Sequence, residues 1–313
     1  MSRIHEALKR AAEERAAQLA AGSEAHAAEV PSELELLKRP PEFTRPAVSV
    51  GDTTSGSGTA FLRFEELGKR CVKLEWRIDP HSSVFINSRP GQEGPERFRA
   101  LRSRLYKIAS TRKLKRVLLT SGVAAEGKTF VALNLAQSMA RQPELRVLLV
   151  DADLRSPRLH HLFGAPICPG LSDYLRGDTD EYAIVQKGLN QSLFLIPGGS
   201  LVSNPSELLR SERMKQLLHR VTPLFDWIIL DSPPCLPADD AGILADLADG
   251  VLFVIRAGST DAQTAERAVA EFQGKNLLGV VLNQVEKGDS QNDSYGRRNC
   301  APETTAPASL ARH

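Results

Sequence analysis

The 313-residue sequence has few cysteines, no long apolar run and almost no net charge, and each shortage excludes a class of protein. Its four cysteines, Cys71, Cys168, Cys235 and Cys300, lack metal-ligand spacing, which argues against a disulfide scaffold or a zinc site and indicates a reducing compartment. No apolar run reaches the roughly 18 residues that a membrane-spanning helix needs. A net charge of +2 is not that of a polycation, so no nucleic-acid partner is expected. We therefore expect a cytoplasmic protein that reaches a membrane only through a partner.

The most informative motif follows an apolar segment at 115–120 and reads SGVAAEGKT. It satisfies G-x-x-x-x-G-K-[ST], the Walker A pattern, with a helical segment behind it. Backbone N–H groups and the helix N-terminus of such a loop favour an anion. Lys128 would add positive charge at the β- and γ-phosphates, and the Thr129 hydroxyl would bind Mg²⁺. The alternative is a strand-to-helix turn that binds nothing. The predicted nucleotide-binding residues in this segment are Gly122, Ala125, Glu126, Gly127, Lys128, Thr129 and Phe130.

Short apolar runs alternate with helical patterns along most of the chain, which predicts an α/β fold. Strands are expected at 72–78, 115–120, 146–151, 193–197, 227–231, 250–255 and 278–283. Helices are expected at 94–110, 128–141, 205–220, 239–248 and 261–273. Asn204 as N-cap and Pro205 at the first helical position specify one helix start. This alternation predicts a P-loop NTPase-like, mostly parallel sheet with helices on both faces and ligands at the carboxyl ends of the strands.

Composition divides the chain into four segments. We expect an N-terminal helix at 1–21, a flexible linker rich in Pro, Ser and Gly at 22–68, the P-loop domain at 69–286 and a disordered tail at 287–313. The N-terminal helix carries one thin apolar stripe, which fits either a docking helix for a partner or a weakly ordered tail.

Three aspartates follow predicted strands. Asp151 and Asp153 lie at the end of the strand that follows the loop helix in the sequence, and Asp231 ends the strand WIILD. Phosphoryl transfer needs Mg²⁺ and a carboxylate that positions or deprotonates the attacking hydroxyl, and three acids at neighbouring strand ends supply both. Asp153 alone also fits a turn cap.

Six sequence blocks occur in the order seen in bacterial tyrosine kinases: SGVAAEGKT, LLVDADLRSPRLHHLF, IPGGSLVSNPSELL, FDWIILDSPP, DGVLFVIRAGST and GVVLNQ. From about residue 94 to residue 285 the chain resembles the cytoplasmic kinase domain of the capsule and exopolysaccharide type. In that family Asp151 and Asp153 match the Walker A-prime motif, and Asp231 matches the Walker B aspartate. The resemblance implies Lys128, Asp151 and Asp153 as catalytic residues and Thr129, Asp151 and Asp231 as metal ligands. Asn283 resembles an adenine-contacting asparagine of related P-loop proteins.

The resemblance also implies an activity and partners. It implies ATP- and Mg²⁺-dependent phosphorylation of protein tyrosine in the control of polysaccharide synthesis and export. Glu96, Arg99 and Arg102 match an E-x-x-R-x-x-R motif used between subunits of a ring, whereas an ordinary solvated helix face is the alternative. The implied activator is a membrane polysaccharide co-polymerase acting in trans, which would recruit this protein to the inner face of the cell membrane.

The sequence departs from the family pattern at two places. Where the family usually has Pro-Gly in the loop, this chain has Ala124 and Ala125; if position 125 needs a positive φ, alanine there costs about 1 kcal/mol. The family also carries a C-terminal tyrosine cluster, whereas this tail has Tyr295 alone. Tyr295 is then a single phosphosite, or the substrate is another protein, or kinase activity is lost while ATP binding persists.

Two other functions compete with the kinase. A ParA/MinD-like ATPase switch has the same fold but carries a signature lysine where this chain has Val123. A nucleotide-gated scaffold for polysaccharide assembly would tolerate the altered loop and the sparse tail. A dinucleotide oxidoreductase is disfavoured because G-x-G-x-x-G is absent after the first core strand.

Overall fold

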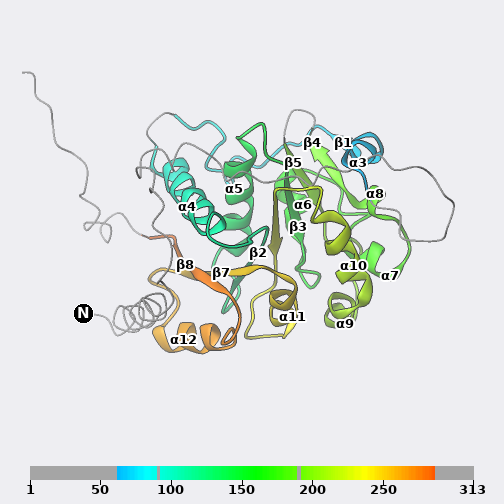
Figure 1. The fold of residues 1–313 in the computed structure, drawn as a ribbon. Coiled ribbons are helices and arrows are strands. Elements are labelled where there is room, and N and C mark those ends of the chain that lie inside the picture. The colour runs from blue at the N-terminus through cyan, green and yellow to red at the C-terminus, as the bar shows by residue number, and fades with distance from the viewer. Residues whose placement is uncertain (1–61, 90–91, 189–191, 286–313) are drawn as a thin grey trace, which may run out of the picture.

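A computed structural model describes residues 62–89, 92–188 and 192–285 (Figure 1). The expected N-terminal helix, most of the expected linker and the expected tail lie outside these ranges. The described strands form one sheet in the order β1-β4-β5-β3-β6-β2-β7-β8. Every neighbouring pair is parallel except β4 with β5. The mostly parallel α/β fold predicted from the sequence is confirmed.

The strands agree closely with the apolar runs of the sequence. They are β1 (Val72–Leu74), β2 (Arg116–Ser121), β3 (Val147–Asp151), β4 (Gln186–Gly188), β5 (Leu193–Ile196), β6 (Trp227–Asp231), β7 (Gly250–Arg256) and β8 (Leu277–Asn283). The sequence analysis missed β4, whose residues Gln-Lys-Gly contain no apolar run.

Apart from the N-terminal helix, which lies outside the described residues, each predicted helical range holds at least one helix, and several short helices were not predicted. They are α3 (Phe64–Arg70), α4 (Glu93–Ala109), α5 (Lys128–Ala140), α6 (Leu159–Phe163), α7 (Leu171–Arg176), α8 (Glu181–Ile184), α9 (Pro205–Arg210), α10 (Glu212–Val221), α11 (Asp240–Leu247) and α12 (Ala262–Ala270). No described helix is both long and apolar enough to cross a bilayer.

Helices cover both faces of the sheet, so successive residues of a strand enter opposite cores (Figure 1). In β2, Val117 and Leu119 pack with α4 and α5, whereas Leu118 joins the core on the other face with α7, α9, α10 and α11. Burial on both faces explains why these strands read as continuous apolar runs in the sequence.

One predicted helix, 205–220, is two helices. Ser211 adopts an extended conformation between α9 and α10, and its hydroxyl accepts a hydrogen bond from the Met214 N–H as the N-cap of α10. Asn204 does precede the first turn of α9, but its amide donates to the Glu207 carboxylate at 2.7 Å and caps no backbone N–H. Helical periodicity alone does not reveal a break of this kind, because the apolar face continues through it.

The predicted strand 72–78 ends early, at Leu74. Beyond it the backbone N–H groups of Arg77 and Asp79 donate to carbonyls at the end of α6 instead of to a neighbouring strand. Trp76 packs edge-on against Phe163 at a centroid distance of 4.7 Å. The alternating pattern therefore reflects packing against α6 as well as a strand.

Helix α3 begins within the range expected to be linker, yet it packs on the core. Leu67 is 1% exposed, and the Phe64 ring meets Phe194 edge-on at 5.7 Å. The Arg146 guanidinium lies 3.5 Å from the Phe64 ring centroid. These contacts make α3 part of the folded unit.

We predict that Leu67→Ala lowers the free energy of unfolding by about 2–3 kcal/mol, because it removes buried methyl groups and leaves a cavity. Lys69→Ala, at an exposed position of the same helix, is the matched control and is expected to change little. Urea unfolding of both variants measures the difference. Equal stabilities of the two variants would show that α3 contributes nothing to the fold.

Candidate active site

The nucleotide loop joins β2 to α5 in a conformation fixed by two residues with positive φ. Gly127 has a φ of 91° and directly precedes α5. Ala125 has a φ of 64°, a left-handed conformation that costs an alanine about 1 kcal/mol. The structure therefore meets the condition under which the sequence analysis expected strain at position 125.

Asn283, at the end of β8, lies directly against this loop. Its side-chain amide donates to the Glu126 carbonyl at 2.9 Å. A Cβ atom on Gly127 would lie 2.0 Å from the same amide nitrogen, so a larger residue there would displace the Asn283 side chain. The predicted adenine-side residue and the phosphate loop are thus in contact.

Two predicted metal ligands, Asp151 and Asp231, lie side by side at the carboxyl ends of β3 and β6. They are register partners in the sheet and are 0% and 1% exposed. One oxygen of Asp151 accepts the N–H groups of Arg158 and Leu159, each at 2.9 Å. The other oxygen, Oδ1, has no protein partner, and neither has Oδ1 of Asp231.

The other predicted functional side chains surround this pair. The Thr129 hydroxyl hydrogen-bonds Asp231. The Lys128 ammonium lies 3.4 Å from Oδ2 of Asp153, in an ion pair whose side chains are 12% and 8% exposed. Oδ1 of Asp153 accepts the Ser156 N–H at 3.0 Å, so this aspartate caps a turn as well as pairing with the loop lysine.

Burial of like charges controls protonation here. Burial raises the pKa of Asp231 from 3.8 to about 7, although Lys128 and the Thr129 hydroxyl act against the rise. Burial and the neighbouring Asp231 raise the pKa of Asp151 well above its ordinary value. A cation placed between the two carboxylates would reverse this effect, because it favours their ionised forms.

The donor set suits Mg²⁺ bound together with a nucleotide. Orphaned buried oxygens on Asp151 and Asp231, with the Thr129 hydroxyl beside them, are the hard oxygen ligands that Mg²⁺ prefers. Among the described residues, no three His, Cys, Asp or Glu side chains are placed to hold a metal ion without other ligands. Mg²⁺ in such sites keeps waters and takes phosphate oxygens, so a small protein contribution fits.

Not every predicted residue joins this centre. The Phe130 ring packs edge-on against Phe98 on α4, with a centroid distance of 6.1 Å. Its side chain is therefore part of the core, and only its main chain is available to a nucleotide. Glu96 and Arg99 form an exposed ion pair along α4. Arg102 donates to the Ser138 carbonyl at 2.6 Å, which ties α4 to α5 within the subunit. Tyr295 lies outside the described residues.

Two sets of contacts at the site were missed in the sequence. The Glu126 side chain, 2% exposed, accepts from the Thr260 hydroxyl at 2.6 Å, across more than a hundred residues of sequence. Arg155 donates to the buried carboxylate of Asp240 at 2.7 Å and to Ser206 at 3.0 Å, which joins the segment after Asp153 to α9 and α11. No local motif announces either contact.

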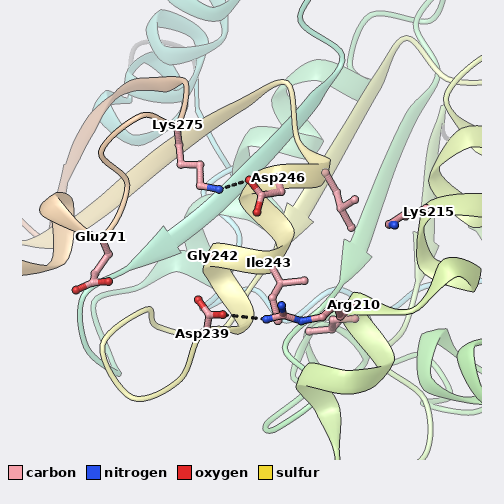
Figure 2. Close-up of a pocket in the computed structure, with 10 residues that line it drawn as sticks. Arg210, Lys215, Asp239, Gly242, Ile243, Asp246, Glu271 and Lys275 are labelled. Atoms are coloured by element: carbon pink, nitrogen blue, oxygen red, sulfur yellow. Dashed lines mark hydrogen bonds and ion pairs between the residues drawn. The ribbon is translucent and has the colours of Figure 1, made fainter.

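The surface has two hollows among the described residues, one beside the nucleotide loop and one away from it. One, of about 230 Å³, is lined by loop residues 123–126 and by Arg256, Ser259, Thr260, Asp261 and Thr264. A second, of about 290 Å³, lies between α9, α11 and the segment after α12 (Figure 2). Its rim carries the ion pairs Arg210–Asp239 and Lys275–Asp246, and no loop residue lines it. The larger hollow is therefore not the nucleotide site.

Comparison with known proteins gives the class first. Residues 117–300 match the model of the CobQ/CobB/MinD/ParA nucleotide binding domain. The chain is thus a P-loop nucleotide-binding domain of this class, in agreement with its sheet order and loop geometry.

Individual relatives narrow the class. The tyrosine-protein kinase YwqD of Bacillus subtilis (strain 168) is 35% identical over 217 residues, which are 68% of this chain and 90% of YwqD. The putative tyrosine-protein kinase AmsA of Erwinia amylovora is 35% identical over 74% of this chain but only 32% of its own length. The solved kinase domain of Escherichia coli tyrosine kinase ETK is 30% identical, with a TM-score of 0.60, over 69% of this chain and 85% of that domain. The chain belongs to the bacterial tyrosine-protein kinases.

We predict that Asp231→Asn stabilises the nucleotide-free protein, and more so as pH rises. A carboxyl whose pKa is raised on folding binds its proton more tightly in the folded state, so the wild type loses stability between pH 3.8 and about 7. Asparagine has no such penalty. The melting temperature of the variant should exceed that of the wild type by a few degrees, on the order of 3 °C or more, at about pH 8.

Melting curves at about pH 5 and about pH 8 measure this difference. Asp239→Asn, which changes an exposed carboxylate, is the control and should show no pH-dependent gain. A gain for Asp231→Asn that is the same at both pH values would contradict the raised pKa.

Proposed function

We propose that this chain is an ATP-dependent protein-tyrosine kinase that regulates the synthesis and export of exopolysaccharide or capsule. The observation that carries the proposal is the buried pair Asp151 and Asp231, in register beside Lys128 and Thr129 of the nucleotide loop. An arrangement that only recognised a phosphate would need the loop amides and no buried carboxylates. Membership of the tyrosine-protein kinases supports the choice of tyrosine as acceptor.

Each residue has a role in this reaction. The loop amides and Lys128 would hold the β- and γ-phosphates, and Thr129, Asp151 and Asp231 would hold Mg²⁺, which neutralises phosphate charge when bound. Asp153, at the edge of the site beside Lys128, would orient the tyrosine hydroxyl and accept its proton. The phenolic oxygen then bonds to the γ-phosphorus as the bond to the bridging oxygen breaks, which releases ADP.

The tyrosines of the folded domain make poor acceptors. The Tyr106 hydroxyl donates to Gln142 at 2.5 Å, and its ring stacks on Trp227 at a centroid distance of 5.5 Å. Tyr174 is 4% exposed under Arg213. Tyr182 is partly exposed, but its hydroxyl hydrogen-bonds Glu66 and the Arg70 guanidinium lies 3.8 Å from its ring centroid. We therefore propose Tyr295 of the same or another copy, or a tyrosine of another protein, as the acceptor.

We predict that Lys128→Met abolishes phosphotyrosine formation, since it removes the positive charge at the transferred phosphate. The protein is incubated with labelled Mg·ATP, with and without the cytoplasmic tail of the candidate membrane co-polymerase, and its phosphoamino acids are analysed. Lys113→Met, which changes an exposed lysine outside the loop, is the matched control and should retain activity. Slow ATP hydrolysis without phosphotyrosine would instead support the ATPase switch or the scaffold.

We also propose that the exposed face of α4 joins subunits into a homo-oligomer. Glu96 and Arg99 form their pair on the surface, where such pairs contribute little to the stability of the subunit. Arg102 has a contact within the subunit, because its guanidinium donates to the Ser138 carbonyl. A role between subunits is thus better tested at Arg99 than at Arg102.

We predict that Arg99→Ala lowers the mass of the oligomer measured by light scattering while leaving the melting temperature nearly unchanged. Arg104→Ala, at an exposed position on the same helix, is the control. If the Arg99→Ala variant forms an oligomer of unchanged mass, Arg99 does not join the subunits.

A further inference from the structure

Glu126 places a buried carboxylate inside the loop that is expected to receive a triphosphate. An unneutralised carboxylate there would repel the ligand, and a buried one needs donors. The structure supplies two: Oε2 accepts the Val123 N–H at 2.9 Å, and Oε1 accepts the Thr260 hydroxyl at 2.6 Å. The carboxylate thus bridges the start of the loop and the segment between β7 and α12.

A second tie reaches the same residue from the next strand. Asn283 donates to the Glu126 carbonyl at 2.9 Å, and Asn283 is the register partner of Arg256 at the end of β7. The segment carrying Thr260 begins directly after Arg256, so both ties start from neighbouring strand ends. Glu126 is held through its side chain and through its main chain by one rigid edge of the sheet.

Ala125, which precedes Glu126, has a strained backbone conformation that neighbouring contacts must stabilise. Ala125 is exposed and has a φ of 64°, so its own side chain makes no buried contact that would fix this conformation. A strained backbone persists only where its surroundings over-determine it. The ties at Glu126 fix the chain on the helix side of Ala125. On the strand side, the Val123 N–H donates to Glu126 and the Val123 carbonyl accepts from the Ser121 hydroxyl at 2.8 Å.

We propose that the Glu126–Thr260 hydrogen bond is a latch that keeps the nucleotide loop in its binding conformation and offsets the lack of glycine at position 125. Thr260 is then a positioning residue: it acts on the nucleotide through Glu126. The inference rests on the proposed function in one respect, that ATP is the ligand of the loop.

The latch predicts a defect in nucleotide affinity. Thr260→Val keeps the shape of the side chain but removes the hydroxyl, so it leaves one carboxylate oxygen without its donor. Loss of a hydrogen bond to a charged group should raise the Kd for Mg·ATP roughly tenfold, measured by calorimetry on the full chain. The KM for ATP should rise in parallel while kcat at saturating ATP stays nearly unchanged, because the loop adopts the same conformation once filled.

Three comparisons separate the latch from a general loss of structure. Thr260→Ser restores the hydroxyl and should restore the Kd to the parent value. Gln263→Ala changes an exposed residue at the start of α12 that does not line the hollow beside the loop, and this variant should bind like the parent. The melting temperature of each variant shows whether it is folded, and a folded Thr260→Val with parental Kd overturns the latch.

Ala125 gives an independent test of the same idea. Glycine adopts a positive φ without strain, so the tenfold effect of Thr260→Val should shrink in an Ala125→Gly background. Ala124→Gly, at a neighbouring position without positive φ, should leave the effect at full size. Equal effects of Thr260→Val in all three backgrounds would show that the latch does not act through Ala125. A parent that binds no adenine nucleotide would overturn the proposed function, whereas a parent that binds while Thr260→Val binds equally well overturns the latch alone.

Discussion

The site depends on one constraint, which is that the buried carboxylates of Asp151 and Asp231 lie side by side at the ends of neighbouring strands. Burial raises the pKa of both carboxyl groups, and the neighbouring Asp231 raises that of Asp151 further. A cation nearby would favour the ionised forms of both. The sheet order creates this pair, because it places β3 beside β6 and brings both strands to the same edge. Strand β2 is the other neighbour of β6, and the loop that follows β2 leads to Lys128 and Thr129. These two residues therefore lie beside the carboxylates. A metal-dependent phosphoryl-transfer site is what this geometry supports.

The nucleotide loop is held by the part of the sheet that lies on the opposite side from the carboxylates. Ties to Thr260 and Asn283 come from the ends of β7 and β8, whereas the acids come from β3 and β6. The loop therefore spans two halves of the sheet, and its position relative to the proposed metal ligands depends on both. Such division suits a reaction whose catalysis is mainly positioning and electrostatic stabilisation.

The chain covers nearly all of YwqD but only about a third of the length of AmsA. Sequence reasoning placed most of the folded domain correctly, because buried parallel strands appear as runs of Val, Ile and Leu whatever surrounds them. It failed where no such run exists: β4 is Gln-Lys-Gly, and the short helices α6, α7 and α8 lack enough turns for a period to emerge. Ser211 was missed because it interrupts the backbone without interrupting the apolar face.

The sequence by itself determined the phosphate loop, the succession of the core strands along the chain and the identity of the acids at their ends. It could do so because spacing and apolar runs are local properties. Tertiary structure alone decided that Asp151 and Asp231 are register partners and that Asn283 touches Glu126. It also decided that the Glu126 carboxylate turns to Thr260. These contacts join residues from separate strands, and their distances follow from how the strands are ordered in the sheet, which no local pattern records.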